Sequence, residues 1–467
     1  MPAINKNQVK REYICNMDFR EYIPFYKRNL KMALPVMLTQ AGQITVHLAD
    51  NIMVGQLGTA ELASVSFSNS IYILGMVFGI GFTQGLTPHI GHSFGKGEHN
   101  MVASLLKNSV LLNTLVSILL TLLMVAVGFF MSYMGQTEQV VSLGKEYYNT
   151  ILFSMLPFLL FFGLRQFSEG IGITKYAMYI TLSANLLNIL LNWILIFGHW
   201  GFEPMGVKGA AVATLISRVL MLILFVILIF RLECYRKYVK IFETPLIQLD
   251  LVKKVLRTSI PLSFQNLVEI TAFSMSAVMI GWLGEVSLAS HQIAMSMSSF
   301  SFMIALGVGA AATIRVSHQY GYGDYKSMRM AGFAAIHLSI VLMSLCGVAY
   351  ILLRNYIPII YTQDPMVRAL AAKLLIVAAL FQVFDAIQLA SLACLRALAD
   401  VKIPLILSIV SYYLVSLPLG YFCGFILNFG TVGVWIGLLL GLLFAAALFL
   451  WRFNNISRQL INKHQML

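Results

Sequence analysis

The chain has 467 residues, of which 59% are hydrophobic and 11% charged, and its mean hydropathy is +0.80. This composition excludes a soluble domain, which has to keep a polar surface, and indicates a protein embedded in a bilayer. The formal net charge of +13 comes from Lys and Arg that gather in alternate segments between apolar stretches. That is a membrane-topology pattern rather than the basic face of a nucleic-acid-binding domain.

The first 32 residues carry seven Lys and Arg but no continuous apolar run, so nothing in them resembles a cleavable signal peptide. Beyond them, stretches of about 20 mostly apolar residues, the length that crosses a membrane, recur about twelve times. The predicted spans are 33–55, 63–90, 106–132, 147–167, 177–198, 206–230, 258–282, 288–314, 330–352, 370–393, 403–425 and 431–451.

The segments between spans alternate in charge. One set holds most of the Lys and Arg, including the run from Arg231 to Arg257, whereas none lies between residues 403 and 451. Because basic loops stay on the cytoplasmic side, both termini are predicted to be cytoplasmic, which requires an even number of spans. The five cysteines have no metal-ligand spacing, so we expect no disulfide framework, metal or cofactor.

An internal repeat divides the chain. Pro35 and Pro261 are 226 residues apart, and the same separation continues without a gap to Gly97 and Gly323. Among the matched pairs are Thr45 and Thr271, Met53 and Met279, Gly58 and Gly284, His92 and His318, and Gly95 and Gly321. The sequence therefore predicts an all-α fold of two six-helix bundles, related by a pseudo-two-fold axis along the membrane normal.

The predicted organisation is a cytoplasmic segment (1–32), an N-lobe (33–230), a cytoplasmic linker (231–257), a C-lobe (258–452) and a cytoplasmic tail (453–467). Such a pair of bundles suits alternating access, in which the space between the lobes opens to one side at a time. We expect a protein that functions as a monomer in the bilayer.

Three acids within the apolar spans are the candidate functional residues: Asp50, Glu269 and Asp385. A carboxylate there costs about 2.5–3.5 kcal/mol on insertion scales, so it indicates function by default. The acids do not follow the repeat, which suggests that the halves have different roles. No intramembrane Lys or Arg partner is visible for any of them, so we expect each to be protonated, hydrated or bound to a cation. The alternative is that each only fixes helix packing through a polar neighbour.

Amides accompany two of these acids. Gln388 lies within one helical turn of Asp385. Asn185, Asn188 and Asn192 share one face of the fifth span. That polar stripe is as consistent with hydrogen bonding between helices as with ligand contact.

Several stretches resemble the multidrug and toxic compound extrusion (MATE) transporters, specifically the NorM-like bacterial branch. The resemblance covers residues from about 30 to 452 and rests on Leu34 and Pro35 with Asp50 to Gly55, Arg165 to Lys175, Asn188 to Trp193, Ala289 to Ala294, and Asp385 to Asp400. It implies a multi-pass protein of the cell inner membrane that exports organic, often cationic or aromatic, drugs in exchange for sodium ions or protons.

The resemblance also assigns roles to residues. Glu269 and Asp385 would bind the coupling cation in the C-lobe, and we include Gln388 in this site because it lies within one turn of Asp385. Asp50, Asn188 and Asn192 would form an N-lobe site for a proton or drug. Two departures leave the coupling ion open: Phe381 stands where some NorM-like members have a tyrosine, and Asn192 stands where archaeal relatives have a second acid.

Two other functions fit the sequence less well. A flippase for lipid-linked oligosaccharides or peptidoglycan precursors would favour Arg or Lys in the cavity, where this sequence places acids. A membrane enzyme would need a clustered nucleophile or metal ligands. His92 and His318 are repeat-matched, lie beside glycines and have no carboxylate at metal spacing, so we predict a structural role for them and no catalytic residue.

Overall fold

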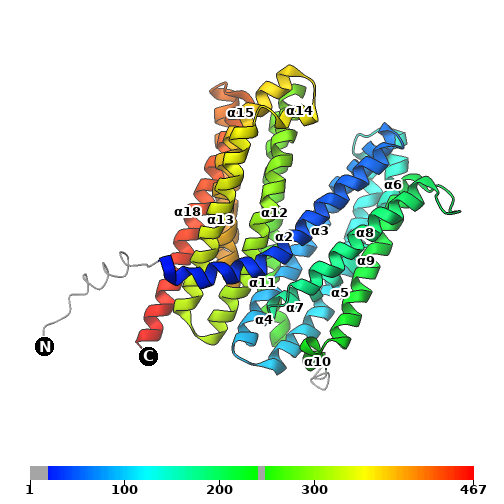
Figure 1. Ribbon diagram of the computed structural model, residues 1–467. Coiled ribbons are helices and arrows are strands. Elements are labelled where there is room, and N and C mark those ends of the chain that lie inside the picture. Colours follow the sequence, from blue (N-terminus) through cyan, green and yellow to red (C-terminus); the bar gives the residue numbers. More distant parts are fainter. Residues whose placement is uncertain (1–18, 240–247, 467) are drawn as a thin grey trace.

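The computed structural model describes residues 19–239 and 248–466, and every regular element in these ranges is helical. The helices form two lobes that lie side by side (Figure 1). The N-lobe contains α2 (Phe19–Gly55), α3 (Thr59–Gln84), α4 (Leu86–Gly95), α5 (His99–Phe129), η1 (Phe130–Tyr133), α6 (Glu138–Leu152), α7 (Met155–Gly170), α8 (Lys175–Phe197), α9 (Gly206–Arg231) and the short α10 (Glu233–Val239). The C-lobe contains α11 (Leu249–Gly281), α12 (Glu285–Tyr322), α13 (Tyr325–Leu353), α14 (Ile357–Tyr361), α15 (Pro365–Ala397), α16 (Lys402–Ile409), η2 (Val410–Ser416), α17 (Leu417–Tyr421), η3 (Phe422–Ile426) and α18 (Gly430–Gln465).

Nine helical spans in the described ranges are long and apolar enough to cross a membrane, and the bent pair α6 and α7 brings the number to ten. The helices α2 and α11 have 37 and 33 residues, which is ample for a crossing, but they carry more charged and polar side chains. With these two, each lobe has six passages. The predicted all-α fold of two repeat-related bundles is confirmed.

Several elements differ in extent from the predicted spans. The span predicted at 147–167 consists of α6 and α7, which meet at 42°. The span predicted at 403–425 contains the π-helical segments η2 and η3, a rare conformation that occurs frequently at functional sites. At the chain ends, α2 begins within the predicted N-terminal segment and α18 continues through most of the predicted tail. Residues 1–18 and 240–247 lie outside the described ranges.

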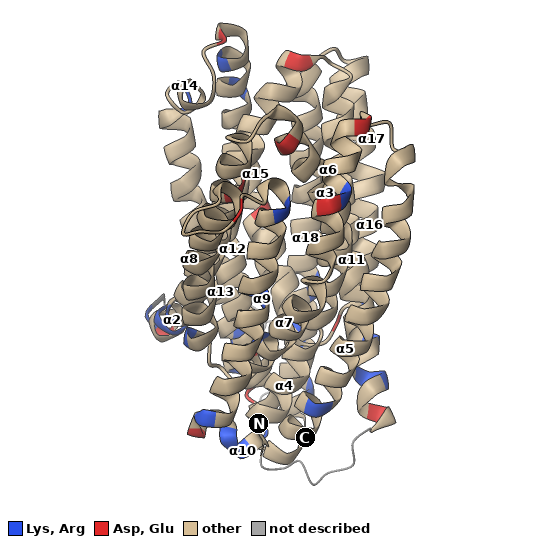
Figure 2. Cartoon of the chain, turned by 90° about the vertical axis from the view of Figure 1, so that its right-hand side faces the viewer, with Lys and Arg blue, Asp and Glu red and all other residues tan. Residues whose placement is uncertain are grey.

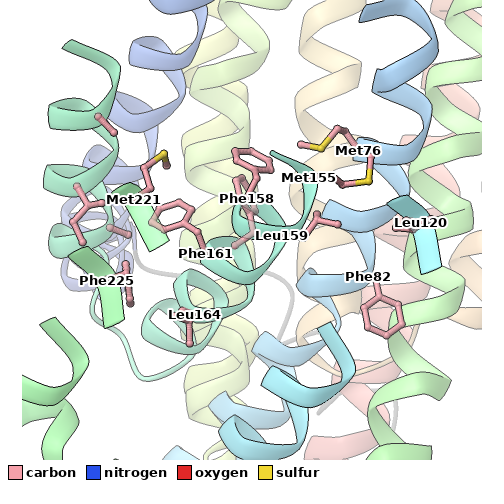
Figure 3. Close-up of a cluster of buried hydrophobic side chains, with 14 of the residues drawn as sticks. Met76, Phe82, Leu120, Met155, Phe158, Leu159, Phe161, Leu164, Met221 and Phe225 are labelled. Atoms are coloured by element: carbon pink, nitrogen blue, oxygen red, sulfur yellow. The ribbon is translucent and has the colours of Figure 1, made fainter. Parts of the chain in front are cut away.

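Each lobe buries an apolar core of its own. In the N-lobe, Phe158, Phe161 and Phe225 pack in one cluster with Met76 and Met155 (Figure 3). The C-lobe has separate clusters, the largest of them along α12, α13, α15 and α18. The starts of α2 and α11 cross between these cores: Ala33 of α2 belongs to the largest C-lobe cluster, and Leu251 and Val255 of α11 belong to the N-lobe cluster.

The first helices of the two lobes begin on the opposite lobe. Figure 1 shows the start of α2 running across the molecule, where Asn29 Nδ2 donates a hydrogen bond to the carbonyl of Ala331 in α13 at 3.1 Å. Correspondingly, the backbone N–H of Gln248, just before α11, donates to Asn108 Oδ1 in α5 at 3.1 Å. The helices α5 and α13 are the third spans of their lobes, so this exchange follows the repeat.

Lys and Arg gather toward one end of the molecule, which we call the basic end (Figure 2). It includes the end of α4, the helix α10, the starts of α11 and α13 and the turn between α15 and α16. The lobes meet near this end and diverge toward the other (Figure 1).

Two repeat-related histidines join the lobes near the basic end. His92 Nε2 lies 2.7 Å from the carbonyl oxygen of Ala397 in the C-lobe, and His318 Nε2 lies 2.7 Å from that of Gly170 in the N-lobe. Gly170 and Ala397 are 227 residues apart, so they too are repeat-related, with one residue inserted. These two contacts, which we call the histidine latch, agree with the structural role predicted for His92 and His318.

The helix ends beside the latch touch through glycines. A Cβ added to Gly95 would overlap the backbone of His318 and lie 2.9 Å from the Cα atom of Gly321. A Cβ added to Gly321 would in turn overlap the carbonyl oxygen of His92 and lie 3.0 Å from the Cα atom of Gly95. The matched glycines therefore let α4 and α12 meet backbone to backbone.

Candidate functional site

The C-lobe brings together two of the predicted acids. Glu269 on α11 and Asp385 on α15 are within electrostatic range of each other. Asp385 is 7% exposed and Glu269 is half-buried. Two carboxylates this close inside a lobe that spans a bilayer are stable together when a proton or a cation offsets their charge.

Asp385 lies among polar atoms that have no protein partner. Within the described part of the chain, Asp385 Oδ1 and both amide atoms of Gln382 and Gln388 are buried without a hydrogen bond. These residues are spaced three apart on α15, so they share one side of the helix. A buried polar atom left unsatisfied costs about 1–3 kcal/mol. Carboxylate and amide oxygens are also ligands that hard cations accept, so this set of atoms fits an ion or its bound water.

Two side chains that the sequence did not single out complete this site. The Tyr412 hydroxyl, on the π-helical η2, lies within interaction range of Glu269 but makes no hydrogen bond of ordinary geometry. Arg396, at the end of α15, is also within electrostatic range of Glu269, and its guanidinium donates to Asn266 Oδ1 at 3.1 Å. The sequence showed no basic residue near Glu269 within the spans, and the structure places Arg396, from the end of α15, within electrostatic range of it.

Phe381 lies in an aromatic cluster one turn before Asp385. Its ring is 5.5 Å from that of Trp435 and 6.1 Å from that of Phe273, and it is 3% exposed. Tyr412 also packs against Phe273, at 6.1 Å. Phe381 and Tyr412, which come from different helices, thus pack against the same ring.

The N-lobe brings together its predicted residues as a chain of hydrogen bonds. Asn192 Nδ2 donates to Asp50 and also to Asn188 Oδ1 at 3.2 Å. Asn188 Nδ2 in turn donates to Thr214 Oγ1 on α9 at 3.4 Å. Asp50, Asn188 and Asn192 therefore form one polar site, as the family resemblance implied, and the asparagines share one face, as the spacing on the fifth span predicted.

The N-lobe also contains a guanidinium that the sequence interpretation missed. Arg218 lies within the apolar helix α9 and donates to Tyr72 Oη at 2.6 Å and to Ser154 Oγ at 2.7 Å. Its guanidinium carbon is 4.5 Å from the centre of the Phe158 ring, and Arg218 is within electrostatic range of Asp50. An arginine inside a predicted span was a visible signal, but its proximity to Asp50 depends on how α2 and α9 pack.

The two polar sites lie in different lobes, which contact each other mainly where α12 packs on α2 and α4 and where α11 packs on α3. A multi-pass helical protein with repeat-related lobes, buried acids in both and each lobe packed around its own core belongs to the class of secondary transporters. Known proteins identify the family within this class.

The family model MatE matches residues 35–194 and 261–422, and the chain belongs to this family. It is 32% identical over 438 residues to a probable multidrug resistance protein NorM of Agrobacterium fabrum, a match that covers 92% of this chain and 93% of that protein. It is 30% identical to the multidrug resistance protein NorM of Vibrio cholerae, covering 92% and 95%. The same fold occurs in a solved structure described as the outward-facing conformation of a multidrug resistance MATE family transporter. The TM-score is 0.85 at 20% identity, and the match covers 94% of this chain and 97% of that one.

Proposed function

We propose that this protein is an antiporter of the bacterial inner membrane that exports organic cations, many of them aromatic, from the cytoplasm in exchange for sodium ions or protons. The observation that carries this proposal is the Glu269 and Asp385 pair inside one lobe, beside polar atoms that lack partners. Two relatives named multidrug resistance protein support the cargo class.

Coupling is assigned to the C-lobe. A sodium ion arrives from outside and binds at Glu269, Asp385 and Gln388, or a proton binds to one of the two carboxylates. Either removes the repulsion between the carboxylates and lets the helices around α15 repack. Cargo is then released outward. Asp50, Asn188 and Asn192 provide a second polar site for drug or proton, and we expect Arg218 to limit the negative charge there because it lies within electrostatic range of Asp50.

The orientation follows from the charge distribution. Basic segments stay in the cytoplasm, so the basic end and both termini are assigned to that side. The lobes meet near this end (Figure 1), and the conformation is therefore the one that is closed to the cytoplasm. Both lobes lie in one chain, so the transport unit is a monomer.

A flippase for lipid-linked sugars or peptidoglycan precursors is the alternative. It gains some support from Arg218 and Arg396, since anionic cargo favours guanidinium groups. Each of these arginines, however, already donates to side chains of the protein, so neither is arranged as an open phosphate clamp. The paired acids in the C-lobe favour cationic cargo.

The test is transport in proteoliposomes. Efflux of the dye ethidium is measured under an imposed pH gradient and, separately, under an imposed sodium gradient. We expect one gradient to drive efflux, and Asp385→Asn to abolish it while the protein still inserts and stays monodisperse. Glu285→Gln is the matched control, because Glu285 is an exposed acid in the first turn of α12. Full transport by Asp385→Asn would refute the coupling site, and efflux without either gradient would refute antiport.

A further inference from the structure

A pocket of about 410 Å³ opens at the basic end, between α11 and the turn that joins α15 to α16. Its lining includes the cations Lys254, Arg257 and Lys402, all of which are exposed. A polar wall is formed by His89 and Thr258, whose Nε2 and Oγ1 atoms are 2.8 Å apart. Neither the acids proposed to couple transport nor the N-lobe polar site takes part in it.

The charge of this pocket is strongly positive. The one acid in its lining, Asp400, accepts hydrogen bonds from Arg452 Nε at 2.5 Å and from Arg452 Nη2 at 3.0 Å. This bidentate pairing neutralises the carboxylate. The three remaining cations face a space large enough for a phosphate group, so the pocket fits an anionic ligand.

The same basic pattern occurs in the other half of the chain. Lys27, Arg28 and Lys31 of α2 are each 226 residues before a cation of α11, namely Lys253, Lys254 and Arg257, and all six are exposed. On the opposite side of these helices, the matched residues Asn29 and Val255 are 0% and 2% exposed. Both helix starts therefore lie with one face on the opposite lobe and a basic face outward.

Exposed apolar residues accompany the cations in both halves. Ile23 and Leu34 of α2 are 59% and 53% exposed, and their repeat partners Leu249 and Ile260 are 67% and 42% exposed. At 100° per residue these positions lie next to the basic positions on the outward side of the helix. Beside the pocket, Ile403, which also lines it, is 42% exposed. A basic stripe beside an apolar stripe is typical of helices that lie at a membrane surface.

We propose that this pocket binds the headgroup of an anionic phospholipid in the leaflet at the basic end. The phosphate lies among Lys254, Arg257 and Lys402, and the acyl chains run along Ile260 and Ile403. A soluble anion would use the cations but would leave the isoleucines exposed, whereas a phospholipid uses both.

The position of the pocket gives such a lipid influence over the lobes. Ala399 lines the pocket and is two residues from Ala397, the carbonyl of which is held by His92 of the other lobe. The start of α11, which carries two of the cations, packs on α5 of the N-lobe. His89 of the N-lobe and Ala399 of the C-lobe both line the pocket, so a bound lipid lies against both sides of the junction between the lobes.

The test measures lipid binding directly, independently of transport. The full-length protein in phosphatidylcholine nanodiscs is titrated with phosphatidylglycerol, and bound lipid is counted by native mass spectrometry. We expect the protein to bind phosphatidylglycerol in preference to phosphatidylcholine. This preference should fall about fivefold for each cation removed and be lost in the pocket variant, Lys254→Gln/Arg257→Gln/Lys402→Gln. The charge-retaining Lys254→Arg/Arg257→Lys/Lys402→Arg should bind like the wild type. The matched control Arg231→Gln/Arg236→Gln/Lys237→Gln, which removes three exposed cations elsewhere at the basic end, should also keep the preference.

Three results would overturn the proposal. The first is a preference that survives in the pocket variant, and the second is an equal loss in the control variant, which would indicate general surface charge. The third is displacement of phosphatidylglycerol by inorganic phosphate, which would identify the pocket as a site for a soluble anion. Should the pocket variant fail to fold, the preference of the wild-type protein for phosphatidylglycerol is measured in high salt. Salt screens exposed charges, so a preference that persists there is not electrostatic and would also overturn the proposal.

Discussion

The histidine latch should set the balance between the two conformations of the lobes. His92 and His318 each make one hydrogen bond across the junction at 2.7 Å, and these bonds must break when the lobes separate at the basic end. A hydrogen bond contributes a net of about 0.5–1.5 kcal/mol. Loss of both therefore removes about 1–3 kcal/mol from the closed state, which shifts the equilibrium toward the state open at the basic end by about 5–150-fold.

The assay is the distance distribution between spin labels at Arg236 in the N-lobe and Lys326 in the C-lobe, both exposed at the basic end. Native cysteines are first replaced by alanine. We expect His92→Ala/His318→Ala to populate a longer distance than the parent protein. Because the two contacts are related by the repeat, the single variants should each produce about half of the change in free energy.

The matched control is His291→Ala. His291 is 2% exposed and accepts a hydrogen bond from Trp435 Nε1 at 3.1 Å, a contact contained within the C-lobe. It should leave the distance distribution unchanged. An unchanged distribution in the double latch variant, or an equal shift in His291→Ala, would refute the idea that the latch holds the lobes together.

Two further predictions concern the polar sites. Asp50→Asn leaves the guanidinium of Arg218 without its nearby carboxylate. This variant should therefore have a lower thermal unfolding midpoint in detergent than Asp50→Asn/Arg218→Gln. A double variant no more stable than the single one would contradict the proposed charge pairing. Tyr412→Phe removes the hydroxyl next to Glu269, so the variant should need severalfold more coupling ion for half-maximal ethidium efflux. Its thermal unfolding midpoint should change little. An unchanged ion dependence would show that Tyr412 is not part of the site.

The candidate site was only partly predictable. Asp385 and Glu269 stood out because a carboxylate in an apolar span is expensive wherever the helix packs, and the Asn188 and Asn192 pair stood out because helical spacing alone places them on one face. Tyr412 gave no such signal. Its role depends on a π-helical segment that brings it to Glu269, and nothing in the local sequence marks that segment.

Arg218 was missed for a different reason. Its charge is as unusual in an apolar helix as that of Asp50, but Arg and Lys were counted only as topology signals between spans. Only the packing of α2 and α9 places it within range of Asp50. Tertiary packing thus places a guanidinium within electrostatic range of Asp50 in the N-lobe and of Glu269 in the C-lobe.

The sequence by itself determined the class of fold, the approximate spans and the two-fold repeat, because membrane insertion depends on the length, hydropathy and flanking charge of each segment separately. It also determined which residues are too costly to bury without a purpose. The tertiary structure alone decided which residues meet: the crossed starts of α2 and α11, the histidine latch and the basic pocket each join segments more than 100 residues apart. Such contacts depend on how completed helices pack, and hydropathy and periodicity within single segments do not encode that packing.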